Sequence, residues 1–354
     1  MALVEIDGSL GEGGGQILRT SVSLACILGK SVRIHNIRAR RSEPGLRPQH
    51  LKAVTSAGEI SNATLRGAQL GSTEIEIVPG ETPKRVSKNI DVGTAGSVSL
   101  IAQTLIPIAM FRGIDLEAEL IGGTEVPASP TIDYVQRVVL PAYQAIGGNV
   151  SIQVKGRGYY PKGGGQVSLK VAGSKSSPRP LSFPEAKTKS EVSILSVSRN
   201  LPDHVGQRQL SSAENVLRRS GFLDIKKEID STGSALSPGS SVLVYSRTTQ
   251  SYLGSAVIGA RGKLSEDVGL EAAQGYLSEA KTEPNVDANL ADMIVTLLSC
   301  VREKCHFSTS RVTEHLRTNL DVSMMLTGSE YEIRQNKERG NWEVRLSGIA
   351  EKSN

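Results

Sequence analysis

Apolar side chains recur at every third or fourth position in several stretches of this chain, and between those stretches apolar and polar residues alternate. A spacing of three and four is typical of a helix that buries one face, whereas alternation is typical of a strand. On this basis, three segments share one layout of helix, strand, helix and closing strands. They cover residues 12–78, 91–171 and 289–347.

The three segments give closely similar sets of predicted elements. In the first we expect helices at 20–28 and 47–61 and strands at 31–36 and 72–77. In the second we expect helices at 96–111 and 132–145 and strands at 114–120, 149–155 and 165–171. In the third we expect helices at 290–301 and 314–325 and strands at 306–308, 330–335 and 342–346. A repeat of roughly 80–100 residues is too long for a solenoid and predicts a few α/β units packed together.

Between the second and third segments the pattern changes. Residues 173–184 are rich in Pro and Ser, which is typical of a linker. After them we expect strands at 191–198, 241–246 and 256–260 and helices at 207–220 and 266–280. We interpret 185–280 as a small inserted domain in a large domain made of 1–184 and 281–354, with repeats at about 1–80, 90–172 and 285–348. The predicted fold class is therefore α/β, or α+β.

Composition narrows the class of protein further. Hydrophobic residues make up 38% of the chain and aromatic residues only 4%, so the core is aliphatic. No apolar run reaches the ~18 residues of a membrane helix, and the N-terminal stretch lacks the pattern of a secretory signal. The three cysteines show no CxxC spacing, which favours a reducing compartment. We therefore expect a cytoplasmic protein that does not bind membranes.

Basic residues are unevenly distributed, although the net charge of the chain is only +5. Residues 30–52 contain seven Lys or Arg side chains and a single acid, Glu43. Such a patch suits a polyanion, whose phosphates release counterions on binding. A solvated basic face is the alternative interpretation.

A glycine-rich stretch near the start of the chain carries one carboxylate. Residues 7–16 read Asp-Gly-Ser-Leu-Gly-Glu-Gly-Gly-Gly-Gln, and residues 161–167 form a near-copy with Lys162 in place of Glu12. Glycine lets the backbone take positive φ and approach a ligand closely. A carboxylate there does not attract phosphate, but it can hold a divalent cation that does. We expect the chemistry in the first copy.

Two further polar residues stand on predicted helices. His315 lies beside an apolar stripe in the first turn of its helix, where free N–H groups favour phosphate. A neutral imidazole is a competent nucleophile, although a capping histidine is the alternative. Asp292 is flanked by Ala and Met on an apolar helix, so its burial requires a partner such as a metal or ligand. With Glu12 it could hold Mg²⁺ or Mn²⁺, whereas the alternative is an acid favoured by the helix dipole.

Several common catalytic motifs are missing from the sequence. It contains no GxxxxGK[ST] phosphate loop, no HExxH or clustered Cys/His zinc set and no GxSxG elbow. The Lys-x-Asp-Gly of lysine nucleotidyl transferases is also absent, because Glu5 stands where that lysine would be.

The motifs together resemble those of the RNA 3′-terminal phosphate cyclase family. The similar stretches run from end to end of the chain: 7–20, 36–50, 122–124 with 129–130, 290–292 and 314–319. The resemblance implies three translation-factor-like α/β repeats with a small thioredoxin-like insert. It also implies that a histidine attacks the α-phosphorus of ATP, that AMP passes to the 3′-terminal phosphate of an RNA, and that the 2′-hydroxyl then closes a 2′,3′-cyclic phosphate. Mg²⁺ or Mn²⁺ would assist.

The resemblance also assigns roles to individual residues. His315 matches the nucleophile, and Glu12 and Asp292 match the carboxylates of the metal and ATP site. Gln103 and Pro130 match positions lining the nucleotide pocket. The expected contacts to RNA phosphates are Arg19, Arg38, Arg41 and Gln49, whereas Arg40 is expected to face solvent. Arginine suits this role because its planar fork grips phosphate oxygens in pairs.

Two positions depart from the family pattern. Ile258 and Asn289 stand where some members have aromatic residues against adenine, so we expect ATP to be held there with weaker stacking. A catalytically silent relative that acts in ribosomal RNA maturation is an alternative function, and it would be expected to lack His315 and parts of the ATP site. An enolpyruvyl transferase of similar repeat architecture is a third possible function, but its motifs are not the ones found in this sequence.

Overall fold

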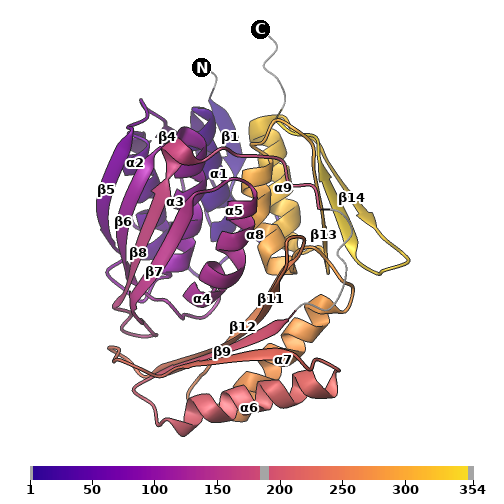
Figure 1. The fold of residues 1–354 in the computed structure, drawn as a ribbon. Coiled ribbons are helices and arrows are strands. Elements are labelled where there is room, and N and C mark those ends of the chain that lie inside the picture. The colour runs from indigo at the N-terminus through magenta and orange to yellow at the C-terminus, as the bar shows by residue number, and fades with distance from the viewer. Residues whose placement is uncertain (1–2, 184–190, 350–354) are drawn as a thin grey trace.

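A computed structural model describes residues 3–183 and 191–349, and within these residues it shows helices packed against four small sheets (Figure 1). This confirms the α/β, or α+β, class predicted from the sequence. None of the helices in these residues is long and apolar enough to cross a membrane.

The first two sheets have the same strand order and the same strand directions. The first is ordered β1 (Val4–Asp7), β2 (Val32–His35), β4 (Ile75–Val78), β3 (Thr64–Arg66). The second is ordered β5 (Arg85–Asp91), β6 (Asp115–Gly122), β8 (Gly165–Ala172), β7 (Val150–Gly156). In each, the first two strands are parallel and the other neighbours are antiparallel.

The third sheet contains β13 (Cys305–Thr309), β15 (Trp342–Leu346) and β14 (Tyr331–Gln335), all antiparallel. On the free side of β13, Ser182 forms a parallel bridge with His306 and Val286 forms another with Thr309. Two parts of the chain that are about 100 residues apart, at Ser182 and at Val286, thus lie along the same side of β13. Between these parts, the chain runs through the region predicted as an insert. The predicted boundary at 184/185 lies outside the described residues.

The principal helices face one another, and the three sheets lie outside them (Figure 1). They are α1 (Gly15–Leu28), α2 (Pro48–Ile60), α3 (Val98–Arg112), α8 (Ala288–Leu298) and α9 (Glu314–Thr327). Helix α1 packs against α2, α3 and α9, and α8 packs against α9. Since α1 and α8 are buried over most of their length, the residues near their N-terminal ends are held by a rigid apolar core.

The predicted helix at 132–145 is interrupted. It is divided into α4 (Ile132–Tyr134), a π-helical turn η1 (Val135–Val139) and α5 (Leu140–Ala145). Pro141 lies two residues after the turn and has no N–H to donate to the carbonyl of Arg137, which breaks the α-helical pattern of hydrogen bonds.

The insert is a separate sheet with two helices on one face. Its strands are ordered β10 (Ile225–Asp230), β9 (Val192–Arg199), β11 (Gly239–Arg247), β12 (Tyr252–Ile258), and its helices are α6 (His204–Arg219) and α7 (Ser265–Ala280). A short 3₁₀ turn, η2 (Gly173–Lys175), lies before the insert. The helices α6 and α7 pack together, whereas α4 and η1 contact the sheet through β11 and β12. The insert therefore borders the second α/β unit.

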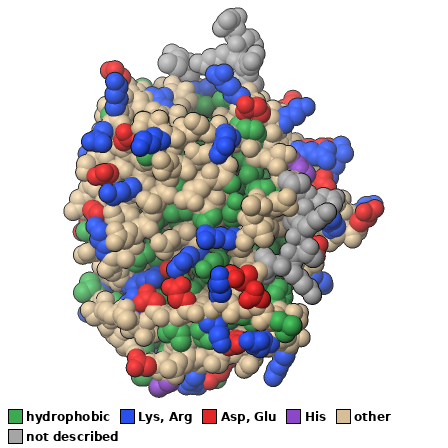
Figure 2. Space-filling model, viewed as in Figure 1, with side chains coloured by type: hydrophobic (Ala, Val, Ile, Leu, Met, Phe, Trp, Pro, Cys, Tyr) green, Lys and Arg blue, Asp and Glu red, His purple; other side chains and the backbone are tan. Residues whose placement is uncertain are grey.

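Charged side chains gather where the insert meets the rest of the molecule (Figure 2). Arg157 is 7% exposed and pairs with Glu125 at 2.7 Å, with Asp133, and with Asp230 of the insert at 3.2 Å. Arg199 of the insert also pairs with Asp230, at 2.8 Å. Removing one member would leave a buried charge without its partner, so this network fixes the insert in place.

Candidate active site

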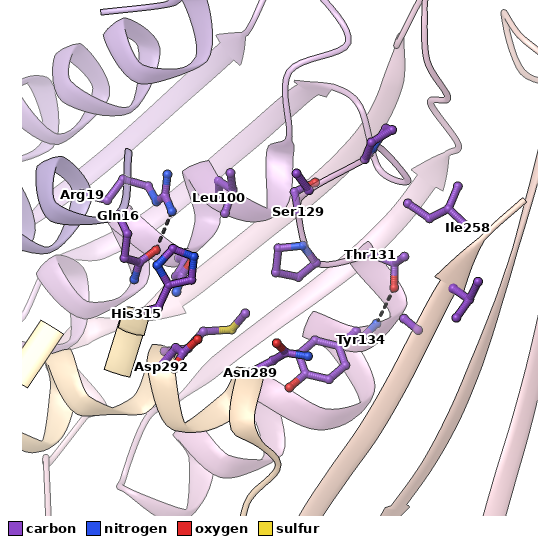
Figure 3. Close-up of a pocket in the computed structure, with 17 residues that line it drawn as sticks. Gln16, Arg19, Leu100, Ser129, Thr131, Tyr134, Ile258, Asn289, Asp292 and His315 are labelled. Atoms are coloured by element: carbon purple, nitrogen blue, oxygen red, sulfur yellow. Dashed lines mark hydrogen bonds between the residues drawn. The ribbon is translucent and has the colours of Figure 1, made fainter. Parts of the chain in front are cut away.

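A cavity of about 510 Å³ lies between the insert and the large helices (Figure 3). Figure 3 shows His315, Asp292, Gln16 and Arg19 on one side of it and Ser129, Thr131, Tyr134 and Ile258 on the other. Seven residues were predicted for the nucleotide pocket, and all of them except Glu12 line this cavity: Gln103, Pro130, Ile258, Asn289, Asp292 and His315. The structure therefore brings together residues separated by more than 200 positions in the chain.

His315 is the second residue of α9, in the first turn as predicted. The helix begins there because the Thr313 hydroxyl oxygen accepts a hydrogen bond from the Leu316 N–H at 2.9 Å. The Nε2 atom of His315 lies 3.7 Å from Oε2 of Glu12, and the imidazole is about half exposed. An imidazole held next to a carboxylate, at a helix start that favours phosphate, is placed for phosphoryl chemistry.

Asp292 is connected to the histidine helix by hydrogen bonds. The Thr313 hydroxyl donates to Oδ1 of Asp292, and the Asn319 amide donates to the Asp292 carbonyl at 2.7 Å. Thr20 of α1 in turn donates to the Asn319 side-chain oxygen at 2.9 Å. Burial raises the pKa of Asp292 to about 7. These contacts fix α1, α8 and α9 relative to one another at the cavity.

Glu12 lies in the glycine-rich loop before α1, next to the cavity and not in its lining. Gly11 and Gly13 on either side of it have φ values of +54° and +58°. A side chain at Gly11 would collide with the hydroxyl of Thr318, since its Cβ would lie 2.1 Å from that oxygen. Glycine at this position thus lets the loop contact α9 directly and brings Glu12 close to His315.

The two carboxylates suit a cation that is shared with a phosphate ligand. Within the described residues, no group of three or more His, Cys, Asp or Glu side chains could enclose a metal. Mg²⁺ commonly uses only one or two protein carboxylates and takes its other ligands from water and substrate phosphates. Glu12 is partly exposed, and Asp292 uses one oxygen for Thr313, so both retain oxygens that could bind an ion.

Arg19 is half-buried and lines the cavity. Its Nη2 donates to the Gln16 side-chain oxygen at 2.5 Å, whereas its buried Nε has no hydrogen-bond partner in the described part of the chain. Burial lowers the pKa of Arg19 to about 10, which still leaves the guanidinium charged at neutral pH. A partly buried cation with one buried N–H left unsatisfied favours an anionic ligand, and this fits the predicted phosphate contact.

The other three predicted phosphate residues lie outside the cavity lining. Arg41 reaches Glu12, with Nη2 and Oε2 3.4 Å apart. Arg38 donates to the carbonyls of Glu43 and Gly45, which orders the basic loop. Gln49 accepts a hydrogen bond from the Ser97 N–H at 3.3 Å. Arg40 is exposed, as expected.

Tyr134 lines the cavity and Asp287 holds it in place, and the sequence patterns revealed neither. The Tyr134 hydroxyl donates to Asp287 at 2.7 Å, and Asp287 also accepts from the N–H groups of Leu290 and Gly254, each at 2.9 Å. This carboxylate joins α4, α8 and β12 of the insert, and burial raises its pKa to about 7. An aspartate directly before the apolar run of α8 was a helix-cap signal that could have identified it.

Glu279 of the insert connects to the same region. Its buried carboxylate accepts hydrogen bonds from the Ala288 N–H at 3.0 Å, from the Ser310 hydroxyl and from Arg311 at 2.5 Å. Ala288 begins the helix that carries Asp292, and Arg311 precedes the helix that carries His315. One insert side chain thus positions both helices.

The comparisons with known proteins agree on one family. The model of the family described as RNA 3′-terminal phosphate cyclase matches residues 10–333. A protein of Archaeoglobus fulgidus with that name is 41% identical over 339 residues, 95% of this chain and 99% of the relative. Its namesake in Thermococcus gammatolerans is 42% identical over 94% of this chain and 95% of the relative, and one in Hyperthermus butylicus is 40% identical over 99% of both. This chain, with its cavity of histidine, carboxylates and arginine, belongs to the RNA 3′-terminal phosphate cyclase family.

Proposed function

We propose that this protein converts the 3′-terminal phosphate of an RNA to a 2′,3′-cyclic phosphate at the expense of ATP, through an adenylylated His315. The observation that carries the proposal is the approach of His315 Nε2 to within 3.7 Å of Glu12, at the edge of a cavity that Asp292 also lines. The names of the relatives support the RNA substrate.

In the first step an unprotonated imidazole nitrogen of His315 attacks the α-phosphorus of ATP. The N–P bond forms as the bond to the pyrophosphate oxygen breaks, and pyrophosphate leaves. Arg19 supplies positive charge where the phosphates would lie. Glu12 and Asp292 are the residues that would hold a Mg²⁺ or Mn²⁺ ion, whose chemistry is to neutralise phosphate charge. The walls at Pro130, Ile258 and Asn289 leave room for the base.

In the second step an oxygen of the RNA 3′-phosphate attacks the adenylyl phosphorus and releases His315. In the third, the adjacent 2′-hydroxyl loses its proton and attacks the 3′-phosphorus, and AMP leaves. AMP is a far better leaving group than a phosphate oxygen, and the hydroxyl is already next to its target. Arg38, Arg41 and Gln49 would hold the RNA end during these steps, since all three belong to the basic loop or the helix that follows it.

The test is cyclisation of a 3′-phosphorylated RNA oligonucleotide in the presence of ATP with Mg²⁺ or Mn²⁺. The product is recognised because phosphatase no longer removes its terminal phosphate. We expect His315→Ala to abolish the product and His204→Ala, at the exposed start of α6, to leave it unchanged. Full activity of His315→Ala would refute the nucleophile. A wild-type protein that binds RNA and makes no product with either metal would favour the silent relative.

A further inference from the structure

The loop that joins β7 and β8 presents an aromatic ring to solvent. Tyr160 is 69% exposed, whereas the preceding Tyr159 is 2% exposed. Lys162, two residues further on, is also exposed, and within residues 3–183 and 191–349 it has no ion-pair partner. This loop is the near-copy of the glycine-rich stretch that carries Glu12, and the proposed reaction gives it no role.

Backbone contacts hold this loop in place. The Gly163 N–H donates to the Tyr159 carbonyl at 2.8 Å, and the Thr124 N–H donates to the Gly158 carbonyl at 2.8 Å. A Cβ on Gly163 would lie 2.8 Å from the carbonyl oxygen of Thr94, so the loop contacts residues 93–97 without a gap. The ring of Tyr160 is therefore presented by a fixed backbone, which reduces the entropy lost when a ligand packs on it.

The same contacts connect the loop to the active site on two sides. Residues 93–97 contact Gln49, because the Ser97 N–H donates a hydrogen bond to the Gln49 side-chain oxygen at 3.3 Å. Tyr159 forms a bridge with Glu125, and Pro127 to Pro130, which begin two residues after Glu125, form part of the cavity wall. The loop that carries Tyr160 and Lys162 is thus connected by backbone contacts to the cavity wall and to the segment that binds Gln49, a residue proposed to hold the RNA end.

The insert adds a second free cation at this place. Gly239 lies against the ring of Tyr159, since a Cβ there would be 2.1 Å from it. The neighbouring Ser240 carbonyl accepts from the Gly259 N–H at 2.8 Å. This brings the turn after β12 to the same end of the insert sheet, close to where β7 ends and β8 begins (Figure 1). Arg261 in that turn is exposed and, within the part of the chain that the structure describes, forms no ion pair.

An exposed aromatic ring with unpaired cations nearby is a combination that binds single-stranded nucleic acid, because bases stack on the ring and phosphates pair with the cations. We propose that Tyr160, Lys162 and Arg261 form a surface that binds the RNA chain upstream of the terminal phosphate. This proposal rests on the proposed function, since it takes the RNA end to lie in the cavity. The surface would stack a base on Tyr160 and pair backbone phosphates with Lys162 and Arg261.

The direct test is binding of a fluorescently labelled, 3′-phosphorylated twelve-nucleotide RNA, followed by anisotropy. We expect Tyr160→Ala to weaken binding on the order of 10-fold, whereas Tyr160→Phe keeps the ring and binds as wild type does. Each lost phosphate contact in Lys162→Ala and Arg261→Ala should lower the slope of log affinity against log salt by about 0.7. Lys170→Ala, at an exposed position further along β8, is the matched control and should change neither quantity.

A catalytic readout separates this proposal from the proposed function. For the twelve-nucleotide RNA the KM of cyclisation should rise in the Tyr160→Ala variant, with little change for a dinucleotide that ends in a 3′-phosphate. If wild type, Tyr160→Ala and the Lys162→Ala, Arg261→Ala double variant bind the RNA with equal affinity, this surface does not bind RNA and the proposal is wrong. If the wild type makes no cyclic product from either RNA, the proposed function fails, whereas the binding comparison still decides the surface.

Discussion

Replacing Thr313 with Val removes one hydroxyl that makes two hydrogen bonds. The hydroxyl oxygen caps α9 through the Leu316 N–H at 2.9 Å, and the hydroxyl proton goes to the carboxylate of Asp292. Loss of a helix cap costs about 1 kcal/mol, and loss of a hydrogen bond to a charged group costs about 1.5–3 kcal/mol. Together they predict a fall of about 2.5–4 kcal/mol in the free energy of unfolding.

Urea unfolding at pH 8 measures this, because that pH lies above the value of about 7 to which burial raises the pKa of Asp292. Thr313→Ser keeps the hydroxyl and should lose less than about 1 kcal/mol, which makes it the matched control. The Val variant should also adenylylate itself more slowly, since His315 lies two residues along the same helix. If Thr313→Val is as stable as wild type, the two hydrogen bonds do not hold the site together and our reasoning is wrong.

Three further predictions concern other parts of the site. Glu279→Gln should lower the melting temperature and also slow self-adenylylation, because its carboxylate holds both α8 and α9. A lower melting temperature with an unchanged rate of self-adenylylation would contradict that role. Burial lowers the pKa of His50 from its ordinary value of about 6.5 to about 3. Below pH 6.5 the unfolded chain therefore binds a proton at His50 that the folded protein does not. The free energy of unfolding should then fall by up to about 1.4 kcal/mol per pH unit as the pH drops from 6.5 to 5.5. His50→Gln should reduce this dependence in urea unfolding, and an unchanged slope would count against it. Arg38→Ala or Arg41→Ala should impair AMP transfer to RNA more than self-adenylylation, and equal loss in both steps would argue against a role at the RNA end.

Local signals allowed many elements to be predicted. The helix of His315 begins at Glu314 as predicted, because Thr313 caps it, and it ends where Gly328 takes a φ of +71°. The helix predicted at 47–61 is α2, Pro48–Ile60. Helix α1 begins at Gly15, five residues before the predicted start, and buries Ile17 and Leu18, which the prediction left in the glycine-rich loop. The helix can begin at residue 15 because that residue is glycine: a Cβ there would lie 2.3 Å from His50 Nε2.

Four strands were not predicted: β1, β3, β5 and β10. Each lies at the edge of its sheet and is short, exposed or weakly apolar. Lys88 interrupts the apolar alternation of β5 between Val86 and Ile90, and β10 faces mostly solvent with apolar residues only at Ile225 and Ile229. Strand β3 has only three residues, and β1 has four. Short or exposed edge strands are defined by backbone pairing, which leaves little trace in a hydrophobic pattern.

The candidate site was partly visible in the sequence. His315, Glu12 and Asp292 stand out because polar residues on apolar helices and in glycine loops require a partner. The contact of Tyr134 with Asp287 joins residues 153 positions apart, and Glu279 acts from the insert on two helices. Such contacts depend on how the units pack and cannot be read from spacing along the chain.

The most direct measurement of the central claim is labelling with ATP that carries ³²P at the α-phosphate, in the presence of Mg²⁺ or Mn²⁺. We predict one label per chain, labile in acid and stable in base as expected for a histidine phosphoramidate, located on the peptide that contains His315 and absent from His315→Ala. A label that persists in His315→Ala, or that maps to another residue, would contradict the account.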